Sequence, residues 1–151
     1  MTASIKFSSV KLVKGGVITG DEKSTGAFTT TDTVYAFGGA TDLWGLALTP
    51  ADVNGSTFGV AVSMIGDSYE ITNDTSQYLK VTNFGFAIPT NATINGVVVD
   101  VEGKETAAGG VSDASIDHVQ ITVYYTEVVG IAGGGRMAVK SLQNLQNLRN
   151  V

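Results

Sequence analysis

A chain of 151 residues, 43% of them hydrophobic, is long enough to fold as one domain with its own core and too short for a second independent domain. The net charge of −5 and the count of nine lysines and arginines argue against a nucleic-acid partner, which would need a broad basic surface. Cysteine is absent, and this excludes disulfides and thiolate metal sites.

The first residues enter a strand pattern directly, without the basic start and apolar run of a signal peptide. No apolar run approaches the roughly 20 residues that span a bilayer. We therefore expect synthesis in a cytoplasm and no membrane partner.

In chain order, the apolar residues of the first strand change phase. Ile5 and Phe7 share one face, whereas Val10 and Leu12 share the other, and this predicts a bulge or a switch between sheets. Residues 14–16 predict a glycine turn into a return strand. An exposed loop is expected at 21–32.

The middle of the chain holds the only tryptophan, Trp44, which we expect in the core. Thr49 followed by Pro50 and Asp52 predicts the start of a single helical turn. Further alternating strands are predicted at 34–37, 58–64, 84–88 and 94–102, with a loop at 105–112.

The clearest strand covers residues 115–126, where Val119, Ile121 and Val123 alternate with polar residues. Several short strands joined by Gly, Asn and Thr turns predict an all-β fold, an antiparallel two-sheet sandwich or jelly roll, over residues 1–129. Closure into a barrel is the main alternative.

The end of the chain has a different character. Residues 130–136 predict a glycine-rich hinge, and residues 137–151 a helical tail. Met137, Leu142, Leu145 and Leu148 fall in one stripe at helical rotation, so we expect a short amphipathic helix. A helix of this length must dock to persist, either on its own sandwich or on a neighbouring subunit.

No catalytic constellation emerges. The single histidine, His118, has Asp117 on the opposite strand face, so the pair cannot converge on a substrate and a solvated strand residue is the better interpretation. The loop aspartates lack the regular spacing of a calcium loop, so no metal or cofactor is predicted; they are Asp42, Asp52, Asp67, Asp74 and Asp113. Tyr35, Phe37 and Trp44 offer a carbohydrate platform as the alternative to a core cluster.

Three sequence blocks together resemble a family of tailed-bacteriophage virion structural proteins. They are DLWG, LTPADVN and FGV within 42–60, NFGFAIP and ATING within 83–96, and DHVQITVYYT at 117–126. The resemblance covers about three quarters of the chain. In those relatives the block like 83–96 precedes the block like 12–62, so a permuted strand order is implied here. The family supplies no catalytic motif to transfer.

The resemblance implies a non-enzymatic virion protein, made in the host cytoplasm, that forms homo-oligomers and binds other virion proteins. Our first hypothesis is a capsid decoration or head-fibre subunit. Its assembly interface is predicted in the tail, with the apolar stripe flanked by Arg136, Lys140 and Arg149. The alternative is a tail or fibre adhesion module that binds host glycans through loops near Trp44 and Tyr69. A hydrolase acting on cell-wall polymer lacks an activated nucleophile.

Overall fold

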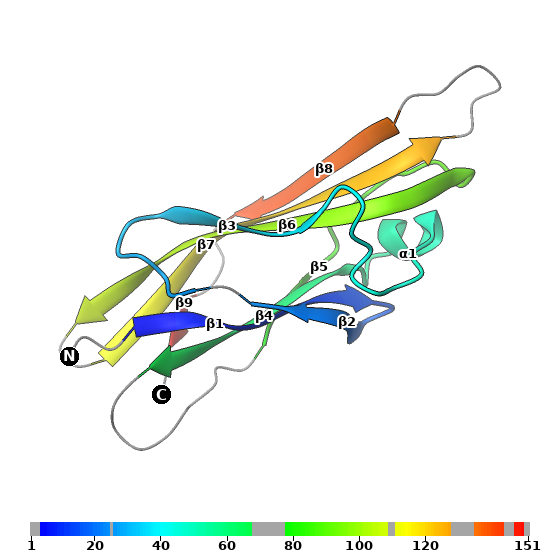
Figure 1. Ribbon diagram of the computed structural model, residues 1–151. Coiled ribbons are helices and arrows are strands. Elements are labelled where there is room, and N and C mark those ends of the chain that lie inside the picture. The colour runs from blue at the N-terminus through cyan, green and yellow to red at the C-terminus, as the bar shows by residue number, and fades with distance from the viewer. Residues whose placement is uncertain are drawn as a thin grey trace.

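The computed structural model describes residues 4–24, 26–67, 78–108, 111–127, 135–143 and 147–149, and beyond residue 127 it describes the backbone alone. Two antiparallel sheets pack face to face as a sandwich, which confirms the predicted class (Figure 1). None of the helices within these ranges is long and apolar enough to cross a membrane.

The first sheet, called sheet A, has the strand order β2-β1-β4-β5. Its register shifts between Phe7 and Ser9 where β1 pairs with β4, which confirms the bulge expected from the change of phase. Gly15 and Gly16 both adopt positive φ in the tight turn between β1 and β2, as glycine readily does. The strands of sheet A are β1 (Ser4–Lys14), β2 (Val17–Lys23), β4 (Gly59–Asp67) and β5 (Leu79–Thr82).

The second sheet, called sheet B, is built on the strand order β3-β6-β7, and the C-terminal strands β8 and β9 both pair with β7. The loop predicted at 105–112 is wrong, because β6 and β7 continue as one long hairpin to Ala108 and Val111. A buried glutamate, Glu105, interrupts the apolar pattern there, so alternation does not indicate a strand in the sequence. The strands are β3 (Thr33–Gly39), β6 (Ala92–Ala108), β7 (Val111–Glu127), β8 (Gly135–Gln143) and β9 (Asn147–Arg149).

The core lies between the two sheets and follows the alternation of the strands. In β7, Val119, Ile121 and Val123 are completely buried, as their spacing predicts. All six phenylalanines take part in ring contacts, for example the edge-to-face pair of Phe7 and Phe37 at 5.0 Å between ring centroids.

Between β3 and β4, the helix α1 (Pro50–Asn54) confirms the predicted single turn. The Thr49 side chain accepts a hydrogen bond from the backbone N–H of Asp52, and the Asp52 carboxylate accepts from the N–H of Thr49. This reciprocal arrangement is a capping box, which satisfies N–H groups that the first turn leaves unpaired.

The strand predicted at 84–88 is wrong, although its alternating apolar residues are buried as expected. Residues 83–91 make no ladder, yet Phe84, Phe86 and Ile88 are each less than 10% exposed. The side chain of Asn54 replaces a neighbouring strand: its Nδ2 donates to Ile88 O and its Oδ1 accepts from Ile88 N, both at 2.8 Å. An extended segment held by a side-chain amide thus shows the same alternation of buried and exposed residues as a strand, although it pairs with no strand.

The C-terminal helix predicted within 137–151 is also wrong, because residues 135–143 and 147–149 form strands. β8 runs antiparallel to β7, with Met137 opposite Tyr124 and Leu142 opposite Val119. In a strand, positions an odd number apart lie on opposite faces, so positions 137 and 142 no longer share a stripe. Pairing with β7 overrides the helical pattern of the isolated segment. Most of the predicted hinge, residues 130–134, lies outside the described residues.

Candidate functional site

The predicted assembly residues are distributed over two strands that pair with β7. Arg136, Met137, Lys140 and Leu142 belong to β8, and Lys140 lies opposite Ile121. Leu148 and Arg149 belong to β9, where they lie opposite Ala114 and Asp113. Leu145 lies outside the described residues. The structure therefore brings the described members to the β7 side of sheet B through backbone pairing.

The Trp44 loop makes hydrogen bonds to both sheets. Trp44 has a φ of 56°, is fully buried, and donates from Nε1 to the carbonyl of Val97 in β6 at 2.9 Å. Its own carbonyl accepts from Asp21 N at 2.7 Å, which ties the loop to β2. A tryptophan held in the left-handed region needs such surroundings to keep its conformation.

Lys23 of β2 and Asp42 of this loop form an ion pair beside Trp44. Lys23 Nζ lies 2.7 Å from Asp42 Oδ2 and 4.9 Å from the centroid of the Trp44 ring. Asp42 Oδ1 accepts from the backbone N–H of Trp44 at 2.8 Å. The hydrogen bonds from Lys23 and from Trp44 hold the pKa of Asp42 below its usual value.

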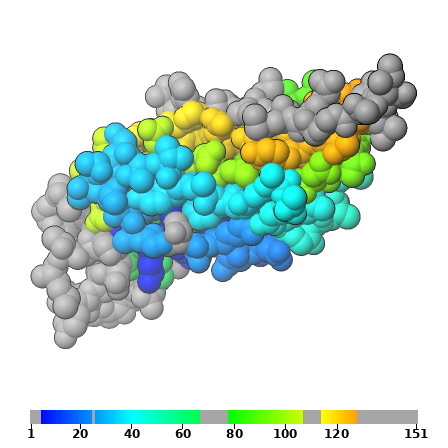
Figure 2. Space-filling view, turned by 45° about the horizontal axis from the view of Figure 1, so that its top comes forward, coloured from blue at the N-terminus to red at the C-terminus, as the bar shows by residue number. Residues whose placement is uncertain are grey.

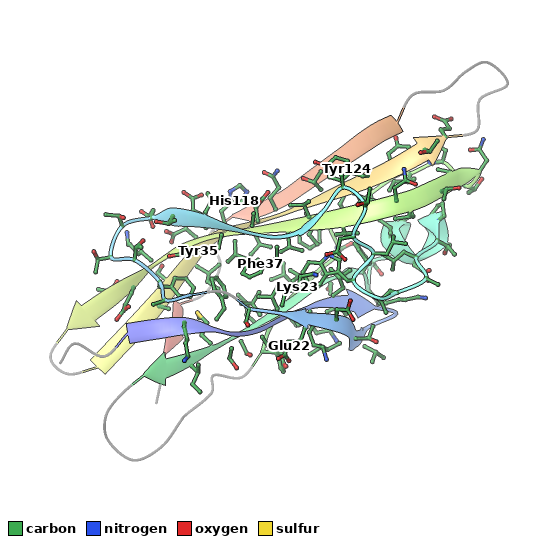
Figure 3. All side chains as sticks on the ribbon, viewed as in Figure 1. Glu22, Lys23, Tyr35, Phe37, His118 and Tyr124 are labelled. Carbon is green, nitrogen blue, oxygen red and sulfur yellow. The ribbon has the colours of Figure 1, made fainter. Side chains whose placement is uncertain are left out.

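These contacts overturn the carbohydrate platform and confirm Trp44 as core. Phe37 is 4% exposed, and Tyr35 packs against Phe7 and Phe28 with ring centroids 5.2 and 5.1 Å away. Figure 3 places Tyr35 and Phe37 between the sheets. None of these three aromatic faces is open to a sugar. Tyr69, the other residue of the adhesion hypothesis, lies outside the described residues.

His118 lies on the outer face of sheet B, where it makes an ion-pair contact across the sheet (Figure 3). Its Nδ1 is 3.6 Å from Glu102 Oε2, and its side chain is 24% exposed, so it is less solvated than the sequence predicts. Burial raises the pKa of the neighbouring Asp100, and His118 opposes that rise. The register shift between β6 and β7 leaves Asp117 as an extra residue between the core residues Ile116 and Val119, so Asp117 and His118 both lie on the outer face, and the prediction that they lie on opposite faces is wrong.

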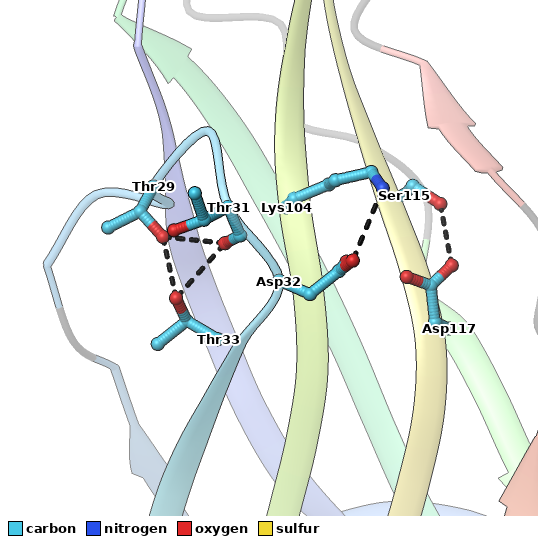
Figure 4. Close-up of polar contacts among 7 residues, drawn as sticks. All are labelled: Thr29, Thr31, Asp32, Thr33, Lys104, Ser115 and Asp117. Atoms are coloured by element: carbon cyan, nitrogen blue, oxygen red, sulfur yellow. Dashed lines mark hydrogen bonds and ion pairs between the residues drawn. The ribbon is translucent and has the colours of Figure 1, made fainter.

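Asp117 instead belongs to a polar cluster on the outer face of β6 and β7 (Figure 4). It accepts a hydrogen bond from the Ser115 hydroxyl at 3.0 Å. Lys104 Nζ lies 3.3 Å from Asp32 Oδ2. The hydrogen bond with Asp117 and the contact with Lys104 hold the pKa of Asp32 below its usual value. Carboxylates from β7 and from the turn before β3 thus meet on one outer face.

The aspartates considered for calcium do not converge. Asp42 is engaged by Lys23, and Asp52 caps α1 while lying 3.6 Å from Lys14 Nζ. Asp74 and the side chains of Asp67 and Asp113 lie outside the description. Over the described part of the chain, no group of three His, Asp or Glu residues is arranged to hold a metal ion.

The outer face of sheet A carries lysines, which the sequence patterns did not single out. Lys11 and Lys80 lie on either side of Ala61 in the register, and Lys6 lies opposite Ile65. Small residues form the surface beneath them, since Ala61 and Ser63 are at most 1% exposed although they lie on this outer face. Lysine stems cover such positions while their charged heads stay in water.

Two other structural residues were also missed. Glu105 is 7% exposed and its Oε2 accepts from Ile5 N at 3.2 Å, a bond that joins sheet B to sheet A. Asn54 holds the segment at Ile88. Only the interruption of an apolar pattern by a charged residue signals Glu105 in the sequence.

Comparison with known proteins identifies no relative: no family model, no curated protein and no solved structure matches the chain.

Proposed function

We propose that this protein is a non-enzymatic structural subunit of a tailed-bacteriophage virion, most specifically a capsid decoration or head-fibre subunit. It would be located in the virion after synthesis in the host cytoplasm, and it would assemble with other virion proteins and with copies of itself. The sequence blocks within 42–60, 83–96 and 117–126 are the basis for the virion assignment. The jelly-roll description of the sandwich stays a prediction.

The observation that carries the assembly role is the backbone pairing of the C-terminal segment along β7. β8 pairs with residues 118–126 and β9 with residues 113–115. The described core residues lie between Ile5 and Val123 in the chain. The same pairing made with β7 of a neighbouring copy would hold one chain to another, because main-chain hydrogen bonds supply affinity in strand addition.

The first test removes residues 131–151 and measures incorporation into particles. We expect the truncated protein to keep a folded sandwich, observed as a cooperative urea transition, and to lose incorporation. A truncated protein that still loads onto particles would contradict the assembly role of the segment. Leu142→Asp should reduce incorporation strongly, whereas the matched control Gln143→Glu, at the neighbouring β8 position, should not.

The second test locates the protein in intact particles by imaging at side-chain resolution. Density repeated over the capsid lattice would establish the decoration role. Density confined to the tail or to a free fibre would refute it and favour the glycan-binding alternative. Binding of purified protein to capsids but to no host cell would exclude that alternative.

A further inference from the structure

The two outer faces of the sandwich carry opposite charge. On sheet A, the described side chains of the outer face include three lysines and one glutamate, a net charge of +2: Lys6, Lys11, Lys80 and Glu22. On sheet B they include four carboxylates and one lysine, a net charge of −3 with histidine neutral: Asp32, Asp100, Glu102, Asp117 and Lys104. We call these the lysine face and the carboxylate face. Figure 2 looks obliquely onto the side where β3, β6 and β7 lie next to each other.

The lysines of the lysine face are not neutralised by any described carboxylate. The ion pairs among the described side chains involve Lys14, Lys23, Lys104 and His118, and none of them includes Lys6, Lys11 or Lys80. Lys80 Nζ donates to the carbonyl of Gly16 at the edge of the sheet, which fixes its position without neutralising it. The lysine face is therefore able to accept carboxylates from outside.

The carboxylate face has the matching excess. Lys104 neutralises Asp32, and Glu102 contacts His118, which is charged only when protonated. Asp100 lies two residues from Glu102 on β6 and has no lysine or arginine among its described contacts; burial already raises its pKa. A cation placed over this face would relieve the unfavourable burial of that carboxylate.

The spacing of the charges on the two faces is compatible. Lys11 and Lys80 are separated by two strand spacings across β4, which is about 10 Å. Asp100 and Glu102 are two residues apart on one strand, which is about 7 Å. Lysine side chains are flexible enough to adjust their charged ends by the difference of about 3 Å. The residue between the two lysines, Ala61, is small and does not project from the face. Each face also offers one exposed apolar side chain, Tyr78 at 43% and Val34 at 56% exposure.

We infer that copies of this chain stack on one another, with the lysine face of one copy against the carboxylate face of the next. The faces lie on opposite sides of the sandwich, so the contact is heterologous and leaves a free face at each end. Such contacts continue into a linear stack or close into a ring. The inference stands on the charges of the two sheets and does not depend on the virion role.

The test is sedimentation of the full-length protein over a range of concentrations and salt. We expect self-association at low ionic strength that weakens at high salt, because exposed charges are screened within about 3 Å at 1 M. Lys11→Gln with Lys80→Gln should raise the dissociation constant roughly tenfold. The control Ala51→Glu with Thr90→Glu makes the same charge change at exposed positions away from both faces, and it should leave association unchanged.

Charge reversal gives the decisive comparison. Lys11→Glu with Lys80→Glu, and separately Asp100→Lys with Glu102→Lys, should each abolish association, while an equimolar mixture of the two variants should restore it. If the Asp100→Lys variant does not fold, Asp100→Asn with Glu102→Gln replaces it, and this variant should associate at least tenfold more weakly. A monomer at every salt concentration, or association that survives both reversals, would overturn the inference. If truncation after Gly130 abolishes association but the charge reversals do not, the association depends on the C-terminal segment and not on the two charged faces.

Discussion

Gly38 occupies the point where the Trp44 hydrogen bond leaves no room for a side chain. Gly38 has a φ of 88°, and a Cβ there would lie 2.2 Å from Val97 O and 2.7 Å from Trp44 Nε1. These two atoms are donor and acceptor of one hydrogen bond. We therefore predict that Gly38→Ala displaces the tryptophan that joins the two sheets.

The cost of Gly38→Ala has three parts. Holding alanine in the left-handed region costs about 1 kcal/mol. Loss of the hydrogen bond between Trp44 and Val97 costs about 1 kcal/mol. Repacking a fully buried indole around an extra methyl group costs about 1–3 kcal/mol. We expect a total decrease of about 3 kcal/mol or more in the free energy of unfolding, a large share of the roughly 5–15 kcal/mol of an ordinary domain.

Urea unfolding measures this change, and Trp44 supplies the signal because it is the only tryptophan. Gly15→Ala is the matched control, since Gly15 also has positive φ, 59°, but nothing lies within 4 Å of its added Cβ. We expect the control to lose about 1 kcal/mol and to keep the native emission maximum, and Gly38→Ala to lose more and to shift its emission to the red. Equal losses in the two variants would refute the reasoning, because only backbone strain would then be involved.

Three further predictions concern polar groups of the sandwich. Asn54→Ala should lower the free energy of unfolding by about 2 kcal/mol in urea, because both hydrogen bonds to Ile88 are lost, and Asn54→Asp by about half as much. Glu105→Ala should cost about 2–3 kcal/mol, because a buried backbone N–H of β1 loses its acceptor, whereas Glu105→Gln should cost under about 1 kcal/mol; equal costs would contradict this role. The lowered pKa of Asp42 stabilises the fold above the ordinary carboxyl pKa of about 3.9, and this contribution disappears as pH falls through the folded pKa. Thermal unfolding of Asp42→Asn should accordingly depend less on pH below about 4 than that of the wild type, and a Lys23→Gln variant should behave alike.

Strand alternation predicted most of the fold because the core follows it closely. Val119 and Ile121 face the core at the positions that period two assigns. The bulge in β1 was predictable for the same reason, since a change of phase requires an extra residue. The prediction failed where the apolar pattern does not match strand pairing. Phe86 is buried in a segment that pairs with no strand, and Glu105 is charged although it is buried within a strand.

The candidate surfaces were less predictable, because they depend on which strands are neighbours. Lys11 and Lys80 are far apart in the sequence and become a pair only when β4 lies between their strands. The same holds for Asp32 and Asp117, which approach each other across β6. Periodicity within one segment assigns a residue to a face, but it cannot say which charges that face collects from other segments.

The C-terminal segment shows how a tertiary partner decides between two patterns. Its leucines fit a helical stripe, but an isolated helix of this length is marginal in water. The 17 residues of β7 present a long row of N–H and C=O groups on the side away from β6, and buried backbone groups of this kind need partners. A strand satisfies the segment and β7 together, whereas a helix would satisfy only its own backbone. Assembly through this segment would therefore depend on backbone pairing along the whole of β8 in addition to its apolar side chains.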